Sequence, residues 1–176
     1  MEMAAGGSGD AVRRRNVVLY VFALLLACGV IIGGFYVARA HQDRQRAAAE
    51  QERYGDVLAA ARKETEAFVN IDYQDAQASI DAVAAGATGD FAKQYDTSTK
   101  DVVKILTQAK SVMEGKVLWA GVVDTDKDSA TVIVATTGTV ANTSTGNKPV
   151  ARQFRIKLDL VREDDAWKTS NVEFVG

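Results

Sequence analysis

A run of acidic residues in the second half of the chain has the spacing of a metal-binding loop. In residues 124–128, DTDKD, three aspartates stand at alternate positions, as they do at the start of a calcium loop. That loop also requires glycine at its sixth position and glutamate at its twelfth, where this chain has Ser129 and Ala135. We therefore predict a solvated hairpin turn and no metal site here.

Two polar loops are the candidate surfaces for contact with a partner. The first is the acidic turn at 124–128, and the second is the loop NTSTGNKP at 142–149. Exposed loops often carry binding residues, although a purely solvated turn is the more common case. The candidate interaction residues in these loops are Asp124, Asp126, Asp128, Asn142 and Asn147.

The side chains that usually carry catalysis are scarce. The chain has one histidine, His41, and one cysteine, Cys28, and without a second histidine no nucleophile–histidine pair can be assembled in the soluble part. An aspartate with a tyrosine could do acid–base work, and Asp72-Tyr73 and Tyr95-Asp96 supply these residue types. Such pairs are frequent by chance, and tyrosines beside helices usually pack with the hydroxyl at the surface. We predict a protein that is not an enzyme and holds no cofactor or metal.

Composition separates an apolar N-terminal region from an ordinary globular one. The 176 residues carry 21 basic and 23 acidic side chains, and the net charge of −2 gives a nucleic-acid partner no electrostatic support. The only long apolar run lies near the N-terminus, and the rest has the mixed composition of a soluble domain.

The apolar run at residues 17–38 predicts a membrane-spanning helix. Its 22 residues carry no charge and would extend about 33 Å as a helix, enough to cross a hydrocarbon core of about 30 Å. Arginines at 13–15 precede it directly, so the positive-inside rule places the N-terminus in the cytoplasm. The expected organisation of this single-pass cell-membrane protein is a cytoplasmic tail at 1–16, a transmembrane helix at 17–38, a helical stalk at 39–53 and an extracytoplasmic domain at 54–176.

Three small residues within this run leave alternatives open. Cys28 ends the sequence LLAC, which resembles a bacterial lipidation site, but the chain stays apolar after it and a buried structural cysteine is the preferred interpretation. Gly29 and Gly33 form GxxxG, a spacing that lets two membrane helices approach closely, although incidental glycines facing lipid fit equally well. A cleaved signal peptide is disfavoured because its apolar core is shorter.

Helix-forming sequence follows the apolar run. The alanine-rich, charged stretch predicts a long helix to about residue 70, with Gly55 as a bend between stalk and domain. Three shorter helices are expected after it, at 75–85, at 91–95 and from Thr97 or Ser98 to Gly115.

The remaining chain has the periodicity of strands. β-Branched or alternating runs predict four strands, at 116–123, 129–140, 151–160 and 167–175. Residues expected to face the core in the last two strands are Phe154, Ile156, Leu158, Leu160, Trp167, Val172 and Phe174. Helices followed by strands predict an α+β fold, with helices packed on a curved four-stranded antiparallel sheet.

The order of these segments resembles a known family. The pieces that carry the resemblance are ATGDFAKQY at 87–95, VLWAGVVDTDKDSATVIVATTGTVAN at 117–142 and WKTSNVEFVG at 167–176, after an arginine-bearing tail, a membrane helix and a polar stalk. The chain resembles the actinobacterial, including mycobacterial, Mce-associated membrane proteins, and the likeness covers nearly everything after the N-terminal tail. It implies an extracytoplasmic domain similar to the NTF2-like and VirB8-like folds, with no active-site residues to carry over.

The same resemblance implies a function. A member would be a non-enzymatic accessory subunit that stabilises or assembles an Mce-type lipid transporter, with Mce transporter subunits or other membrane-complex proteins as partners. One alternative is a VirB8-like core component of a secretion system, which would share the fold and topology. Another is a small-molecule-binding, lipid-binding or enzymatic NTF2-like cone, since a binding role needs only shape and an apolar lining.

Overall fold

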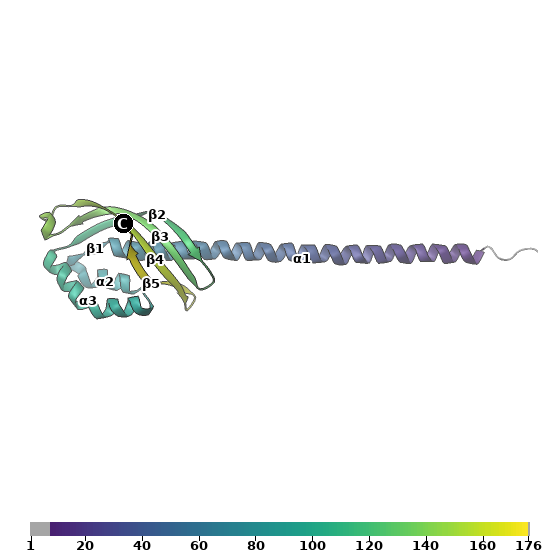
Figure 1. Cartoon of the computed structure of the whole chain (residues 1–176), viewed down its shortest axis with the longest axis horizontal. Helices are drawn as coiled ribbons and strands as arrows, with labels where there is room; N and C mark the ends of the chain where they lie inside the picture. The colour runs from purple at the N-terminus through teal and green to yellow at the C-terminus, as the bar shows by residue number, and fades with distance from the viewer. Residues whose placement is uncertain (1–7, 176) are drawn as a thin grey trace, which may run out of the picture. The chain divides into compact units, whose positions relative to one another are not determined.

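The computed structural model describes the backbone of residues 8–175 and the side chains of residues 36, 39 and 41–175. The chain forms two compact units, Met1–Glu50 and Gln51–Gly176, and helix α1, Ser8–Val69, begins in the first (Figure 1). The predicted transmembrane segment at 17–38 falls almost wholly outside the described side chains, and so do Cys28, Gly29 and Gly33. Among the residues that are described, no helix combines the length and apolar character needed to cross a membrane.

The second unit begins on α1, and a single stripe of this helix is buried. Val57, Ala61, Thr65 and Val69 follow one another at intervals of four residues, which places them on one helix face, and all four are buried. The Thr65 hydroxyl donates to the Ala61 carbonyl oxygen at 2.7 Å, so this polar group is satisfied within the helix. Helix α1 continues through Gly55, so the helix does not end there, and a bend at this residue stays a prediction.

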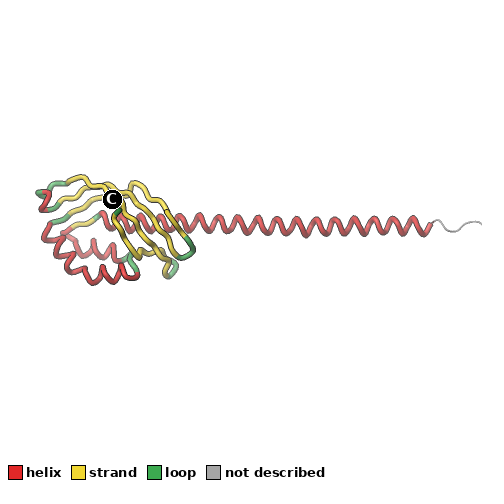
Figure 2. The backbone as a smooth tube through the Cα atoms, viewed as in Figure 1, coloured by secondary structure: helices red, strands yellow, loops and turns green. Residues whose placement is uncertain are grey.

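The sheet of the second unit has five antiparallel strands in the order β1-β2-β3-β4-β5. Their bounds are β1 Ile71–Asp72, β2 Val112–Thr125, β3 Ser129–Ala141, β4 Val150–Glu163 and β5 Ala166–Phe174. The predicted count of four is wrong by one, because β1 is two residues long and carries no alternating pattern of its own. The four long strands are those the sequence predicts, and they form a meander (Figure 2).

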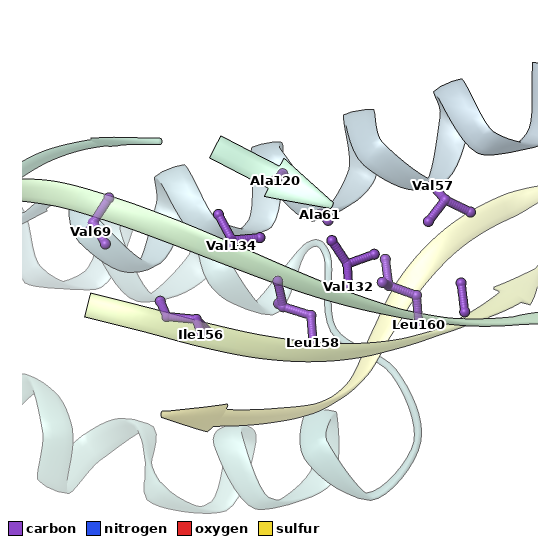
Figure 3. Close-up of a cluster of buried hydrophobic side chains, with 10 residues drawn as sticks. Val57, Ala61, Val69, Ala120, Val132, Val134, Ile156, Leu158 and Leu160 are labelled. Atoms are coloured by element: carbon purple, nitrogen blue, oxygen red, sulfur yellow. The ribbon is translucent and has the colours of Figure 1, made fainter. Parts of the chain in front are cut away.

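The core lies between one face of this sheet and the buried stripe of α1. On β3 the buried side chains alternate, as one buried sheet face requires, and β4 continues the same face through its register with β3. Figure 3 shows these side chains gathered against α1; the buried strand residues are Ala120, Ala130, Val132, Val134, Ile156, Leu158 and Leu160. Phe154, Trp167 and Val172 pack against the cluster as expected, whereas Phe174 is largely exposed.

Two helices join α1 to the long strands, with the short 3-10 helix η1, Tyr73–Asp75, before them. They are α2, Ala76–Ala84, and α3, Gly89–Ala109, which is a single helix where two were expected. The hydroxyls of Thr97, Ser98 and Thr99 donate to carbonyl oxygens four residues earlier at 2.8–2.9 Å. Because these groups bond back along the helix, they do not cap a new one, and the helix continues.

Helix α3 ends at Ala109, before the predicted stop at Gly115. Lys110 takes the left-handed conformation, and its N–H donates to the Thr107 carbonyl oxygen at 3.2 Å. The Ser111 N–H donates to the Leu106 carbonyl oxygen at 3.0 Å, so the last turn is closed without glycine. This early stop frees residues 112–115 to extend β2 beyond its predicted beginning.

Candidate functional site

Strand β2 leaves most of its outer edge without a strand partner. On that side β1 pairs only with Val112 and Met113, and the side chain of Asn70 exchanges two hydrogen bonds with the backbone of Gly115. Within residues 8–175 no other strand lies on this side, so the edge is open over residues 116–125. Open edges present backbone groups that can bind another chain.

Three large apolar side chains are exposed along this open edge. Leu118 and Trp119 are each 56% exposed, and Val123 is 61% exposed. The pairing of β2 with β3 shifts between Val117 and Trp119 and again between Val122 and Asp124, so Leu118 and Val123 are the extra residues of two bulges. Bulges re-aim side chains, and here each one leaves an apolar side chain in solvent. We call Leu118, Trp119 and Val123 the β2 edge surface.

The indole ring of Trp119 lies over Gly121, which leaves room for it. A Cβ added at Gly121 would overlap the far edge of this ring, so the absence of a side chain at Gly121 is what lets the ring lie along the strand. Trp119 therefore has room to lie along the surface, where it is largely exposed. Exposed aromatic side chains of this kind are enriched in protein interfaces.

The opposite edge of the sheet, along β5, is paired at one position. Residues 86–88, which join α2 to α3 and which we call the strap, run beside β5, and Ala87 forms a parallel bridge with Thr169. The Thr88 N–H donates to the Thr169 carbonyl oxygen at 2.8 Å, and the Thr169 N–H donates to the Gly86 carbonyl oxygen at 2.8 Å. The outer edge of β5 is thus bonded to the strap at Thr169.

The acidic turn predicted at 124–128 lies at the end of the β2 edge surface. The Asp126 carboxylate accepts hydrogen bonds from the N–H groups of Asp128 and Ser129, both at 3.3 Å, and the first of these contributes most to lowering the Asp126 pKa. Asp126 therefore organises the turn, while Asp124 and Asp128 are exposed. A role in binding a partner stays a prediction for all three aspartates.

Two asparagines stabilise the second predicted loop, at residues 142–149. Asn142 caps the short helix η2, Thr143–Thr145: its side chain accepts from the Thr145 N–H at 3.1 Å, while the Thr145 hydroxyl accepts from the Asn142 N–H at 3.0 Å. Asn147 has a φ of 59°, a left-handed conformation that asparagine tolerates well. Both residues therefore have structural roles, and contact with a partner stays a prediction for them.

A buried carboxyl group was missed by sequence reasoning. Glu64 on α1 is only 4% exposed, and its Oε1 atom is buried without a hydrogen-bond partner. Its other oxygen lies against the strap, where a Cβ added at Gly86 would overlap it. Burial raises the pKa of Glu64 from 4.5 to about 7, against an opposing effect of Lys63. Helical spacing could have predicted this burial, because Glu64 lies seven residues after Val57 and so falls on the same face of α1.

Tyr95, which the sequence pairs with Asp96 as a possible acid–base pair, is affected by the charge of Glu64 on α1. Burial raises the pKa of the Tyr95 hydroxyl, and the charge of Glu64 raises it further. The Tyr95 ring packs with Phe68 and Phe91 at centroid separations of 6.5 and 5.7 Å. Tyr95 and Phe91 also line an open hollow of about 360 Å³ between α3 and β5.

The other predicted acid–tyrosine pair has a structural role. Asp72 caps η1, where its carboxylate accepts from the Gln74 N–H at 2.8 Å. Among the described residues, no three histidine, cysteine, aspartate or glutamate side chains are grouped so that they could hold a metal ion.

Two solved structures of known proteins are similar to this one. An IcmL-like type IV secretion system protein of Legionella pneumophila is 8% identical, with a TM-score of 0.56 over 69% of this chain and 91% of that chain. A ketosteroid isomerase-like protein of Erwinia carotovora atroseptica is 22% identical, with a TM-score of 0.54 over 71% of this chain and 98% of that chain. These likenesses support the expected NTF2-like and VirB8-like fold, with helices and a curled antiparallel sheet, and they concern the fold alone.

The sequence itself has a relative in Mycobacterium tuberculosis (strain ATCC 25618 / H37Rv). The uncharacterized protein Rv1363c is 29% identical over 163 residues, which are 92% of this chain and 60% of the relative, so the chain spans about 60% of that protein's length. Residues 15–176 also match the model of the family described as "Uncharacterized protein Rv1363c/MT1408-like". The chain therefore belongs to the Rv1363c/MT1408-like family.

Proposed function

We propose that this protein is a non-enzymatic accessory subunit that assembles or stabilises a membrane complex, and that the complex is an Mce-type lipid transporter. The observation that carries the proposal is the open β2 edge with its exposed Leu118, Trp119 and Val123. The resemblance to Mce-associated proteins supplies the candidate complex. The apolar sequence at 17–38 supports an anchor in the cell membrane, with the domain on the outer side.

The β2 edge surface suits a short extended segment of a partner subunit. Apolar side chains of that segment would bury the edge surface, and unpaired backbone groups of β2 would bind its backbone. The two bulges interrupt a regular ladder, so the side chains of Leu118, Trp119 and Val123 carry most of the affinity. The acidic turn beside them favours a basic residue at one end of the segment.

Replacing the edge surface tests this proposal in native membranes. Tagged full-length protein with Leu118, Trp119 and Val123 all changed to serine should no longer co-purify Mce transporter subunits, identified by mass spectrometry. The matched control is Ile105→Ser, which removes an equally exposed apolar side chain from α3 (61% exposed) and should co-purify them normally. The proposal fails if neither variant changes the recovered transporter subunits, or if deletion of the protein leaves the levels of those subunits unchanged.

A VirB8-like role in a secretion machine is the second candidate. It is favoured by the likeness to the IcmL-like type IV secretion protein, which has the higher TM-score of the two solved structures described above. The same purification separates the candidates, because secretion subunits in place of transporter subunits would assign the protein to a secretion complex. An NTF2-like binding or enzymatic cone is a third candidate, and the hollow beside Phe91 and Tyr95 is where its ligand would bind.

A further inference from the structure

Glu64 is enclosed by α1, the strap and α3. Its carboxyl group lies against Gly86 of the strap, and its Oε1 atom has no hydrogen-bond partner. An ionised carboxylate in such a place is costly unless water or a cation reaches it. A protonated carboxyl group fits the same place much better.

The groups that face Glu64 do not supply a compensating charge within hydrogen-bonding distance. On its own helix, Lys63 acts only at a distance and lowers the pKa of Glu64 by less than burial raises it. On α3 the titratable group that interacts electrostatically with Glu64 is the Tyr95 hydroxyl, whose raised pKa keeps it neutral at ordinary pH. The strap presents uncharged Gly86, and Thr169 on β5, which bonds the strap backbone, has a buried hydroxyl without a hydrogen-bond partner.

The strap is held on the sheet by few bonds. Two backbone hydrogen bonds join it to Thr169, and the Thr88 hydroxyl donates to Glu163 on β4 at 2.5 Å. Glu163 is itself 3.5 Å from the ammonium group of Lys168. The strap is also bonded to the helices on either side, because Gly86 and Ala87 donate to carbonyl oxygens of α2 and the Thr88 carbonyl oxygen accepts from Ala92 of α3. The strap can therefore leave β5 together with these adjoining helix ends, without α1 or the core of the sheet unfolding.

We propose that Glu64 is a proton-operated latch: its protonated form packs beneath the strap and keeps the strap on β5, and its ionised form draws water in and releases the strap. Movement is expected at the strap because Gly86 is the part of the enclosure that the carboxyl group touches directly. Release frees the N-terminal end of α3, where Phe91 and Tyr95 line the hollow facing β5. The latch thus sets how open that hollow is.

Hydrogen exchange of the full-length protein in detergent micelles tests the latch. The N–H groups of Thr88 and Thr169 are bonded only while the strap is in place, so their protection reports its release. If Glu64 titrates near 7 under the strap and near 4.5 when released, the released fraction rises about tenfold between about pH 6 and about pH 8, after correction for intrinsic exchange. Peptides from the core strands should show no matching change.

Two variants control the exchange experiment. Glu64→Gln has nearly the same shape and cannot ionise, so its strap protection should not change with pH. Glu66→Gln removes an exposed carboxyl group from the same helix and should behave as the wild type. The proposal is overturned if wild type and Glu64→Gln show the same pH dependence, or if the core strands lose protection together with the strap.

A second measurement keeps the test decisive if Glu64→Gln does not fold. Carbon NMR of labelled glutamate in the wild-type protein should show the Glu64 carboxyl group titrating near neutral pH, with the backbone signals of Gly86 and Thr88 moving at the same midpoint. A Glu64 midpoint in the ordinary range for glutamate, or strap signals that do not follow it, would overturn the latch.

Discussion

The side-chain amide of Asn70 pairs with the backbone of Gly115 in the way a neighbouring strand would. Its Nδ2 donates to the Gly115 carbonyl oxygen at 3.0 Å, and its Oδ1 accepts from the Gly115 N–H at 3.2 Å. Nδ2 also donates to the carbonyl oxygen of Glu66 at 2.8 Å, in the last turn of α1. One side chain therefore joins the end of α1 to β2 and marks where the open edge begins.

Asn70→Ala should destabilise the protein by about 2 kcal/mol, because three hydrogen bonds of about 0.5–1.5 kcal/mol each are lost at a partly solvated site. The free energy of unfolding, from urea titration followed by circular dichroism, measures this. The control is Asn171→Ala, an exposed asparagine whose side chain makes one hydrogen bond, to Asp159. Equal costs for the two variants would contradict the joining role of Asn70.

The long strands could be predicted from sequence, because alternation and β-branching follow directly from one buried sheet face. β1 could not, since two residues hold no pattern and its pairing partner, Val112–Met113, reads as the end of a helix until Lys110 is seen to stop α3. The run of Thr97 and Ser98 was ambiguous for a related reason. A hydroxyl can cap a helix or bond back within it, and only the surrounding packing decides.

The interaction surface and the buried acid depended on details that sequence does not expose. Leu118 and Val123 look like ordinary strand residues, and only the two bulges turn them outward. Glu64 stands in a charged helical stretch among Lys63 and Glu66, which are exposed. Glu64 is buried because of which face of α1 packs on the sheet, and that packing is decided by strand residues far along the chain.

Two glycines should respond in opposite directions to alanine. A Cβ at Gly138 would overlap the carbonyl oxygen of Glu114 and the Cα of Gly115, which are backbone atoms of β2, so Gly138→Ala should cost about 2 kcal/mol or more. A Cβ at Gly55 meets nothing within 4 Å, and Gly55→Ala inside α1 should stabilise the helix by about 1 kcal/mol. Urea titrations of both variants check the pair. A stabilising Gly138→Ala would show that β2 and β3 are not in close contact there.

Gly121→Ala should displace the indole ring of Trp119, because the new methyl group overlaps the ring edge. The ring is the far end of a flexible, exposed side chain, so the free energy of unfolding should change by less than about 1 kcal/mol. With Trp167 replaced by phenylalanine, the fluorescence of Trp119 should change in wavelength or intensity. The recovery of partner subunits should fall as well, and an unchanged recovery would show that the ring position is not used in docking.

The raised pKa of Glu64 makes stability depend on pH in a defined direction. The protonated form is favoured in the folded state, so the stabilising contribution is complete below about pH 4.5, falls as the pH rises through the window from 4.5 to about 7, and changes no further above it. A shift of that size corresponds to about 3 kcal/mol of lost stability. Glu64→Gln lacks this dependence and should be more stable than the wild type above pH 7 by up to that amount.

Urea titrations at several pH values between about 5 and 8 measure the effect as a difference between wild type and Glu64→Gln. Taking the difference cancels the other titrating groups, such as Glu163, whose pKa is lowered chiefly by the hydrogen bond from Thr88. Glu66→Gln supplies the comparison for a carboxyl group that is exposed on the same helix. A wild-type deficit that stays constant with pH would mean that Glu64 is ionised in the folded protein throughout, and that water or a cation already reaches it beneath the strap.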